Sequence, residues 1–300
     1  MLLLLALIGA EFYFIPSQLH VAASGYAGCN ARPAAQLLLD SAQWQRWWPN
    51  HKGIDDFKHE DFSFSISDRS PYAANIIITD KAGHSIVSVA NIILYKNDTT
   101  GVEWQCTLKS SANPIQRIQN YLLATKIKKN MDRLLKAFIL FSNEEKNIYG
   151  VKIEREKFRD TFMISSQIVV KEYPSVNKIY EEIEKLKMYA ASKDASPINS
   201  PMLNIDAVDS TGYLLKLAIP ISKEIASSDV YRFRFMIQGN TLQSTVTGGP
   251  QTIKNTIEQM RLYIGDYHLS SPAIPFESMV TDRNREADSS KVAAIDFLSD

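Results

Sequence analysis

The chain has 300 residues, and its 33 basic and 33 acidic side chains leave no formal net charge at pH 7. This length is typical of two domains of roughly 150 residues each, and an apolar content of 45% allows each domain to bury a core. The balanced charge argues against a dedicated nucleic-acid-binding protein, which normally carries a basic excess, so we predict no nucleic-acid partner.

The first 16 residues are far more apolar than the rest of the chain. Leu2–Ala10 is a continuous apolar run, and after Glu11 the run continues to Pro16. The run is shorter than the ~20 residues that span a bilayer, and no Lys or Arg precedes it as in a secretory signal. One interpretation is a buried first strand or helix. We favour an anchor or signal segment over residues 1–16, which predicts a transmembrane helix, a membrane partner, and domains held outside the cytoplasm.

The cysteines and histidines indicate no metal or cofactor. Cys29 and Cys106 lack Cys-x-x-Cys spacing, which favours two buried free thiols, with a single bridge as the alternative in an exported chain. The five histidines have no metal-ligand spacing, and the sequence contains no phosphate loop, dinucleotide fingerprint or Gly-x-Ser-x-Gly. We therefore predict neither a metal site nor a cofactor.

Residues 17–147 are predicted to form the first domain, which ends at the polar break Glu144–Asn147. An extended segment and a short helix come first, then an antiparallel meander separated by turn signals, and finally a long helix. The predicted elements are extended 18–26, helix 33–39, strands 62–67, 74–79, 85–94 and 101–110, and helix 118–141. The apolar stripe of the long helix consists of Ile127, Met131, Leu134, Leu135 and Phe138.

A tryptophan-rich segment gives this domain its family resemblance. Leu37–Asp40 is followed by Trp44, Trp47 and Trp48-Pro49. Together with the order of elements, the segment resembles the START-like (SRPBCC, polyketide-cyclase-like) superfamily. The resemblance implies a helix-grip fold with a cavity for apolar ligands between the sheet and the long helix, and it transfers no catalytic residues. Of the strand neighbours Glu103 and Trp104, we expect Trp104 to face the interior.

Residues 148–300 are predicted to form the second domain, in which two similar segments follow each other. A strand over 161–170 precedes a helix with Ile179, Ile183, Leu186 and Ala190 on one face. A strand over 241–247 and the turn Gly248-Gly249-Pro250 precede a helix with Ile253, Ile257, Met260 and Ile264 at the same spacing. Strand candidates at 212–220, 276–281 and 292–298 follow the helices. This pattern predicts a duplicated β-α-β-β unit with both helices on one face of a single sheet and a groove between the halves.

The second domain resembles the gyrase-inhibitor-like (GyrI-like) small-molecule-binding domain. The segments that carry the resemblance are Ile179-Tyr180, Ala218–Pro220, Gly248–Pro250 and Pro275–Asp282. The family often has an aromatic residue where this chain has Gln251, and commonly has Trp-Glu-x-Tyr where this chain has Phe276–Met279. This chain keeps the acid of that motif, Glu277, but lacks part of its aromatic surroundings. The resemblance therefore does not specify the class of ligand.

Glu277 is the main candidate functional residue. The family resemblance implies that this acid lies in the floor of a pocket suited to cationic, aromatic compounds. Tyr231, Phe233 and Phe235 alternate on a strand candidate and share one face, where they are suited to stacking or cation–π contacts. The predicted ligand-binding set is therefore Glu277, Phe276, Tyr231, Phe233 and Phe235. The alternative is that the aromatic residues are core and that Glu277 is hydrogen-bonded to a backbone group or a Tyr hydroxyl.

The sequence thus predicts an α+β protein with a START-like helix-grip domain followed by a GyrI-like domain. The function we favour is non-enzymatic binding of hydrophobic or cationic small molecules by a membrane-anchored protein. One alternative is a hydrolase in which Glu277 acts as the general base that activates water. Another is a membrane-associated scaffold without a ligand.

Overall fold

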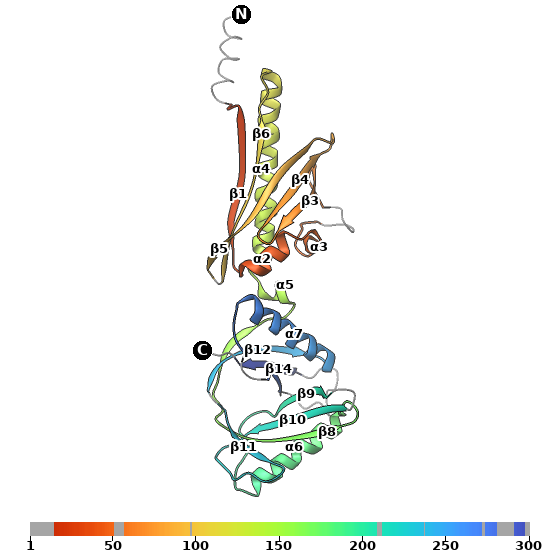
Figure 1. Cartoon of the computed structure of the whole chain (residues 1–300), viewed down its shortest axis with the longest axis vertical. Coiled ribbons are helices and arrows are strands. Elements are labelled where there is room, and N and C mark those ends of the chain that lie inside the picture. Colours follow the sequence, from red (N-terminus) through yellow and green to blue (C-terminus); the bar gives the residue numbers. More distant parts are fainter. Residues whose placement is uncertain are drawn as a thin grey trace, which may run out of the picture. The chain divides into compact units, whose positions relative to one another are not determined.

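The structure is a computed structural model of the chain. It describes residues 15–50, 57–96, 98–208, 212–236, 238–271 and 274–280, and the backbone of 291–297. The chain divides into two compact units, Met1–Ile148 and Tyr149–Asp300 (Figure 1). The predicted α+β class is confirmed, because antiparallel sheets and helices occur in both units.

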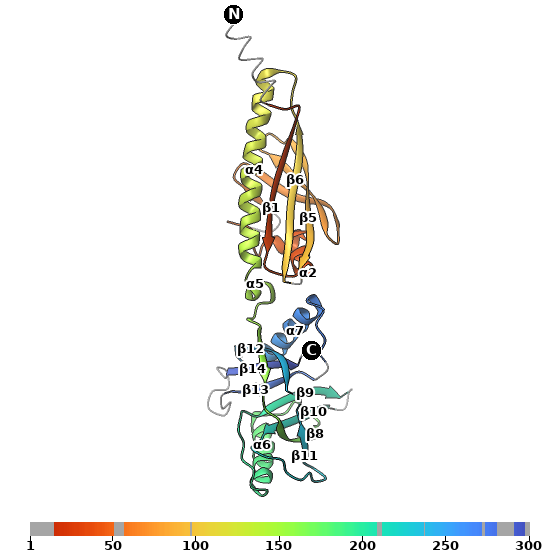
Figure 2. The same ribbon diagram turned by 90° about the vertical axis from the view of Figure 1, so that its left-hand side faces the viewer.

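The first unit is a six-stranded antiparallel sheet with one long helix, α4, lying along strand β1 (Figure 2). The order across the sheet is β1-β6-β5-β4-β3-β2. Two short helices connect β1 to the rest of the sheet. The elements are β1 (Gln18–Ala27), α2 (Ala31–Leu38), α3 (Ser41–Trp44), β2 (Lys58–His59), β3 (Phe62–Ser70), β4 (Ala73–Asp80), β5 (Ser85–Lys96), β6 (Thr99–Lys109) and α4 (Pro114–Ser142).

Helix α4 begins four residues before the predicted start. The side chain of Asn113 accepts hydrogen bonds from the backbone N–H groups of Ile115 and Gln116, and Pro114 occupies the first turn, where its missing N–H costs nothing. These capping residues, rather than the apolar periodicity, determine where the helix begins. The predicted apolar stripe is confirmed, because all five of its residues are buried.

Aromatic rings fill the space between α4 and the sheet. Trp47 contacts Phe138 of α4 with ring centroids 5.3 Å apart, and Trp48 contacts Phe64 of β3 at 5.3 Å. Phe64 in turn contacts Trp104 of β6 at 5.9 Å, so a continuous chain of rings crosses the interior. Trp104 is buried, as predicted. In the described residues, this region is packed core where the START-like resemblance implied a cavity.

The second unit is an eight-stranded antiparallel sheet with two helices. The order across the sheet is β11-β8-β10-β9-β13-β14-β12-β7. The short helix α5 (Glu145–Tyr149) lies at the division between the units. The remaining elements are β7 (Glu154–Phe158), β8 (Phe162–Val170), α6 (Val176–Ala191), β9 (Met202–Val208), β10 (Gly212–Pro220), β11 (Arg232–Phe235), β12 (Gly239–Thr247), α7 (Pro250–Asp266), β13 (Phe276–Met279) and β14 (Lys291–Phe297).

The two halves of this sheet have the same pairing order. In the first half β10 pairs with both β8 and β9, and in the second half β14 pairs with both β12 and β13. Strands β9 and β13 join the halves at the centre of the sheet. The outer strands are exchanged: β7 precedes β8 but pairs with β12, whereas β11 precedes β12 but pairs with β8.

Helix α7 begins at Pro250, directly after the predicted Gly-Gly turn, but its buried face is rotated from the predicted one. Ile253 and Met260 are buried as expected, together with Thr256 and Tyr263. Ile257 and Ile264 are only half-buried. The rotation places Ile257 at the flank of the helix, where it lines the groove described below.

The prediction of a transmembrane helix and of a membrane-anchored location is corrected. Among the described residues, every helix is either too short or too polar to cross a bilayer. Even the 29-residue α4 is too polar to cross, because lysines and other polar residues cover its outer face. Residues 1–14, on which the prediction depended, lie outside the described residues.

Cys29 and Cys106 are buried thiols that form no disulfide, which confirms the favoured interpretation. Cys29 follows β1, and Cys106 lies on β6. Burial raises the pKa of the Cys106 thiol to about 11. Both side chains therefore behave as small apolar core residues rather than as reactive thiols.

Candidate ligand-binding groove

Strand β13 places Glu277 on the helix-bearing face of the second sheet. Glu277 lies directly opposite Leu203 across the β13–β9 pair, so the two side chains point to the same face. Leu203 packs in the apolar cluster that includes Ile179 and Ile183 of α6. Phe276, one residue earlier, belongs to a separate cluster with Met163 and Met202 on the opposite face.

Glu277 lines a groove of about 530 Å³ between helix α7 and the centre of the sheet. The carboxylate-bearing residue is only 7% exposed. Apolar side chains from α7 and β9 form much of the wall, namely Ile253, Ile257, Leu203 and Ile205. Because Leu203 also packs against α6, helices α6 and α7 lie on the same face of the sheet.

Two tyrosines give the groove an aromatic side. Tyr173 precedes α6 and Tyr213 is the second residue of β10, and both line the groove. Their rings meet edge to face with centroids 5.4 Å apart. The two side chains therefore present aromatic surface to the same space as the Glu277 carboxylate.

Charged side chains other than Glu277 lie mostly at the outer surface of the groove. Lys254, Glu258 and Arg261 are exposed residues of α7. Asp206 of β9 is half-buried and accepts a hydrogen bond of 2.8 Å from Lys216. Among the lining residues, Glu277 is therefore the buried acid, surrounded by apolar and aromatic groups.

The structure does not bring the other predicted site residues to this groove. Strand β11, which carries Phe233 and Phe235, lies at the far edge of the sheet, with β8, β10 and β9 between it and β13. Phe233 and Phe235 pack on each other and on Phe162, and Tyr231 packs on Tyr189 of α6 with ring centroids 4.8 Å apart. Phe276 is on the opposite face of the sheet. Of the predicted set, Glu277 is the residue that lines the groove.

Sequence reasoning missed Tyr173, Tyr213 and the strand that carries Leu203 and Ile205. Strand β9 follows the segment Ser196–Pro201, whose two prolines are typical of a loop. Its own alternation of Leu203, Ile205 and Ala207 with polar Asn204 and Asp206 was the available signal. Tyr213 directly follows Gly212 at the start of a strand that the sequence did predict.

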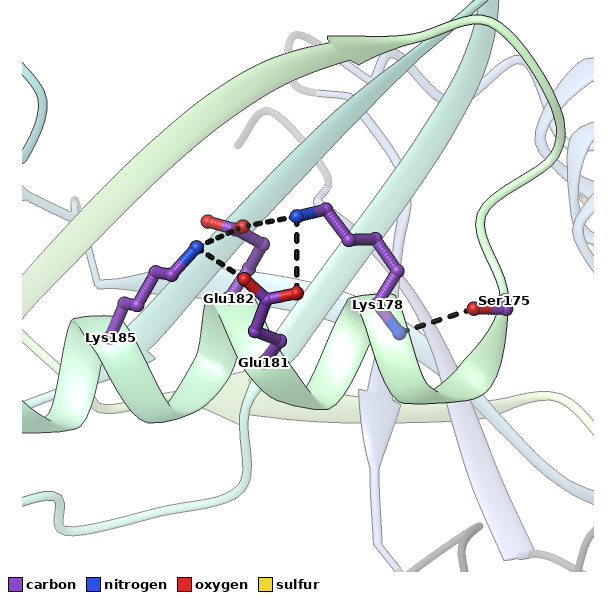
Figure 3. A network of polar contacts seen from close by, with 5 residues as sticks. All are labelled: Ser175, Lys178, Glu181, Glu182 and Lys185. Atoms are coloured by element: carbon purple, nitrogen blue, oxygen red, sulfur yellow. Dashed lines mark hydrogen bonds and ion pairs between the residues drawn. The ribbon is translucent and has the colours of Figure 1, made fainter.

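A second group of acids in this unit, on α6, is fully paired and has a structural role. Lys178 and Lys185 each contact both Glu181 and Glu182, and Ser175 caps the helix by accepting from the backbone N–H of Lys178 (Figure 3). Burial raises the pKa of Glu182, but the hydrogen bonds from Lys185 and Lys178 outweigh that effect and lower it overall. These carboxylates are neutralised within their own helix and offer no charge to a ligand.

No family model matches the chain, and no curated protein matches it. Among solved structures, the chain is similar to the EcmrR C-terminal domain, with a TM-score of 0.43 and 10% identity over 50% of this chain and 98% of that one. EcmrR in a complex with DNA gives 0.45 and 11% over 63% and 72% of the two chains. A hydrolase from Listeria innocua gives 0.36 and 14% over 53% and 98%. These likenesses are too weak to carry a functional argument, which rests on the groove itself.

Proposed function

We propose that the second unit binds small hydrophobic cations in the groove beside Glu277, without chemical turnover. The observation that carries this proposal is a carboxylate-bearing residue, 7% exposed, in a groove with apolar and aromatic walls. A carboxylate beside apolar and aromatic surface attracts a cation more strongly than one in open water, because fewer water molecules screen the two charges. A cation with an apolar body is complementary both to this acid and to the walls around it.

The remaining walls fit the same class of ligand. Tyr173 and Tyr213 offer ring faces and edges for stacking and cation–π contacts. Leu203, Ile253 and Ile257 offer an apolar surface for the body of the ligand. A volume of about 530 Å³ lies in the range of small-molecule sites. We infer that charge selects the ligand and that the apolar walls supply most of its affinity.

The proposed domain identities follow the same division of the chain. The matched strand pairing of the two halves supports an internally duplicated GyrI-like domain over residues 148–300. The order of strands and helices, with α4 along the sheet, supports a START-like helix-grip domain over residues 17–147. Because aromatic rings fill the interior of the first unit, we assign ligand binding to the second.

Differential scanning calorimetry of the full chain with a set of lipophilic cations and neutral lipids tests the proposal. A ligand at many times its Kd stabilises the native state by roughly 2–4 kcal/mol, which is several degrees in melting temperature. Wild-type protein should be stabilised by the cations, and Glu277→Gln should not. Glu224→Gln, which removes an exposed acid outside the groove, is the control and should behave as wild type.

Turnover measured in the same samples distinguishes the hydrolase alternative from the binding proposal. If Glu277 were a general base, ester substrates would be consumed by wild-type protein and not by Glu277→Gln. If the unit were a scaffold, none of the compounds would stabilise it. Either result would replace the binding proposal.

A further inference from the structure

A second and larger cavity, of about 700 Å³, opens on the face of the sheet opposite the Glu277 groove. Ser165 of β8, Met202 of β9 and Ala218 of β10 line it. Ala218 lies directly opposite both Ser165 and Met202, so the three side chains share one face. Leu203, which neighbours Met202, points the other way into the cluster with α6. The two cavities therefore belong to opposite faces of the sheet.

Strand β11 extends this face with two arginines. Arg232 lies opposite Ser165 and Arg234 lies opposite Met163, so both guanidinium groups project on the side of the larger cavity and both residues line it. The intervening Phe233 packs instead with the cluster around α6. The Arg-Phe-Arg-Phe sequence of β11 thus gives one face of the sheet edge a basic character and the other an aromatic one.

Arg232 and Arg234 carry the charges of this cavity that a ligand can contact. Lys216 also lines it, but its ammonium group is 2.8 Å from the carboxylate of Asp206. Within the described part of the chain, neither Arg232 nor Arg234 forms an ion pair. Asp229 is the acidic residue among those lining the cavity, and it is exposed. Two guanidinium groups therefore outweigh one carboxylate at the rim.

Apolar side chains form the rest of the cavity. Met202 and Phe276 are buried in its floor, where they pack with Met163. Val230 and Ile274 are 61% and 52% exposed beside it, although both are aliphatic. Phe276, which sequence analysis assigned to the Glu277 site, contributes to this cavity instead. A basic rim over an apolar floor is complementary to a molecule with an anionic head and an apolar body.

We propose that this cavity is a second ligand site, selective for small amphipathic carboxylates. The carboxylate head is held by Arg232 and Arg234 on β11, and the apolar body lies over Met202 and Phe276. The site is distinct from the Glu277 groove, since it opens on the other face of the sheet and has the opposite charge preference, and the two share Leu203 and Asn204 of β9. A failure to bind cations would therefore not count against this second site.

The test uses a fluorescent carboxylate and its uncharged counterpart. The full-length protein is titrated with 11-(dansylamino)undecanoate and with the methyl ester of the same compound. A charge-assisted contact from guanidinium to carboxylate corresponds to roughly tenfold or more in affinity, so the acid should bind at least about tenfold more tightly than the ester. Arg232→Gln/Arg234→Gln should abolish that difference. Val230→Asp, at an exposed position, should weaken binding of the acid without disturbing the core.

Matched controls make the outcomes decisive. Lys171→Gln/Lys223→Gln removes the same charge from exposed positions outside the cavity and should change the affinity by less than about twofold. Tetraphenylphosphonium, a cation directed to the Glu277 groove, should not displace the dansylated acid. Equal binding of acid and ester, or equal loss in both double variants, would overturn the proposal. So would a dimer that forms with increasing concentration and excludes the probe, because the face would then be an interface between two copies of the chain.

Discussion

Glu277 and Leu203 face each other across strands β13 and β9, with their side chains on the same side of the sheet. Leu203 is buried against α6, while Glu277 is 7% exposed beside the apolar residues of α7. An acid thus occupies a position whose cross-strand neighbour is a core residue. The pairing explains why this acid lies at the wall of a groove on the helix-bearing face of the sheet.

A buried hydrogen bond in the first unit predicts a stability change that can be measured separately. The indole N–H of Trp104 donates to the hydroxyl of Ser88 at 2.8 Å, and Ser88 donates to the carbonyl of Ile76 at 2.7 Å. Ser88→Ala leaves the buried indole N–H without this acceptor and should lower the free energy of unfolding by about 1–3 kcal/mol. All four tryptophans lie in residues 1–148, so urea unfolding followed by tryptophan fluorescence reports this unit.

The double variant Ser88→Ala/Trp104→Phe checks the cause of that loss. Removing the indole N–H also removes the need for an acceptor, so the two substitutions together should cost less than the sum of the single effects. Additive effects would show that the hydrogen bond between Trp104 and Ser88 is not the source of the loss.

The thiols should be unreactive in the folded protein. Both cysteines are buried, and the raised pKa of Cys106 leaves only a small fraction of thiolate at pH 8. We expect no reaction with Ellman's reagent under native conditions, and reaction of two thiols per chain in concentrated guanidinium chloride. Rapid labelling of the native protein would contradict the packing around β1 and β6.

The network on α6 predicts a pH dependence for the second unit. The pKa of Glu182 is lowered in the folded state, so its stabilising contribution is fully present above the unfolded value of about 4.3 and is lost as pH falls through the lower folded value. Glu182→Gln should therefore lower the calorimetric melting temperature at pH 7 and have a smaller effect at pH 3. Glu184→Gln, which removes one exposed contact with Lys187, is the matched control. Equal effects of Glu182→Gln at both pH values would contradict this assignment.

Local sequence patterns predicted most of the elements because alternation and helical periodicity depend on neighbouring residues. Strands β8, β10 and β12 and helices α6 and α7 have their expected positions to within a few residues. Strand β9 was missed because Pro197 and Pro201 precede it, and two prolines this close together are typical of a loop. The starts of α4 and α7 depend on Asn113 and Pro250 rather than on periodicity.

The candidate site was only partly predictable, because sheet order is not a local property. The alternation of Tyr231 and Phe233 correctly placed both on one face, where each packs against the cluster around α6. Nothing in that alternation shows that β11 pairs with β8. This pairing places β11 three strands away from β9 and four strands away from β13. Tyr213 lines the same groove as Glu277 because β10 pairs with β9 and β9 pairs with β13, and Tyr173 lines it through its ring contact with Tyr213.

The most direct test of the proposed function compares two ions of the same shape and opposite charge. Isothermal titration with tetraphenylphosphonium and tetraphenylborate uses the full chain carrying Arg232→Gln/Arg234→Gln, which removes the proposed anion site, and measures how strongly charge selects the ligand of the Glu277 groove. The buried carboxylate predicts that the cation binds at least about tenfold more tightly than the anion, and that Glu277→Gln removes this preference while Glu224→Gln keeps it. Equal affinities for the two ions in this background, or a preference that survives when Glu277→Gln is added, would contradict the assignment of Glu277 as the counter-charge.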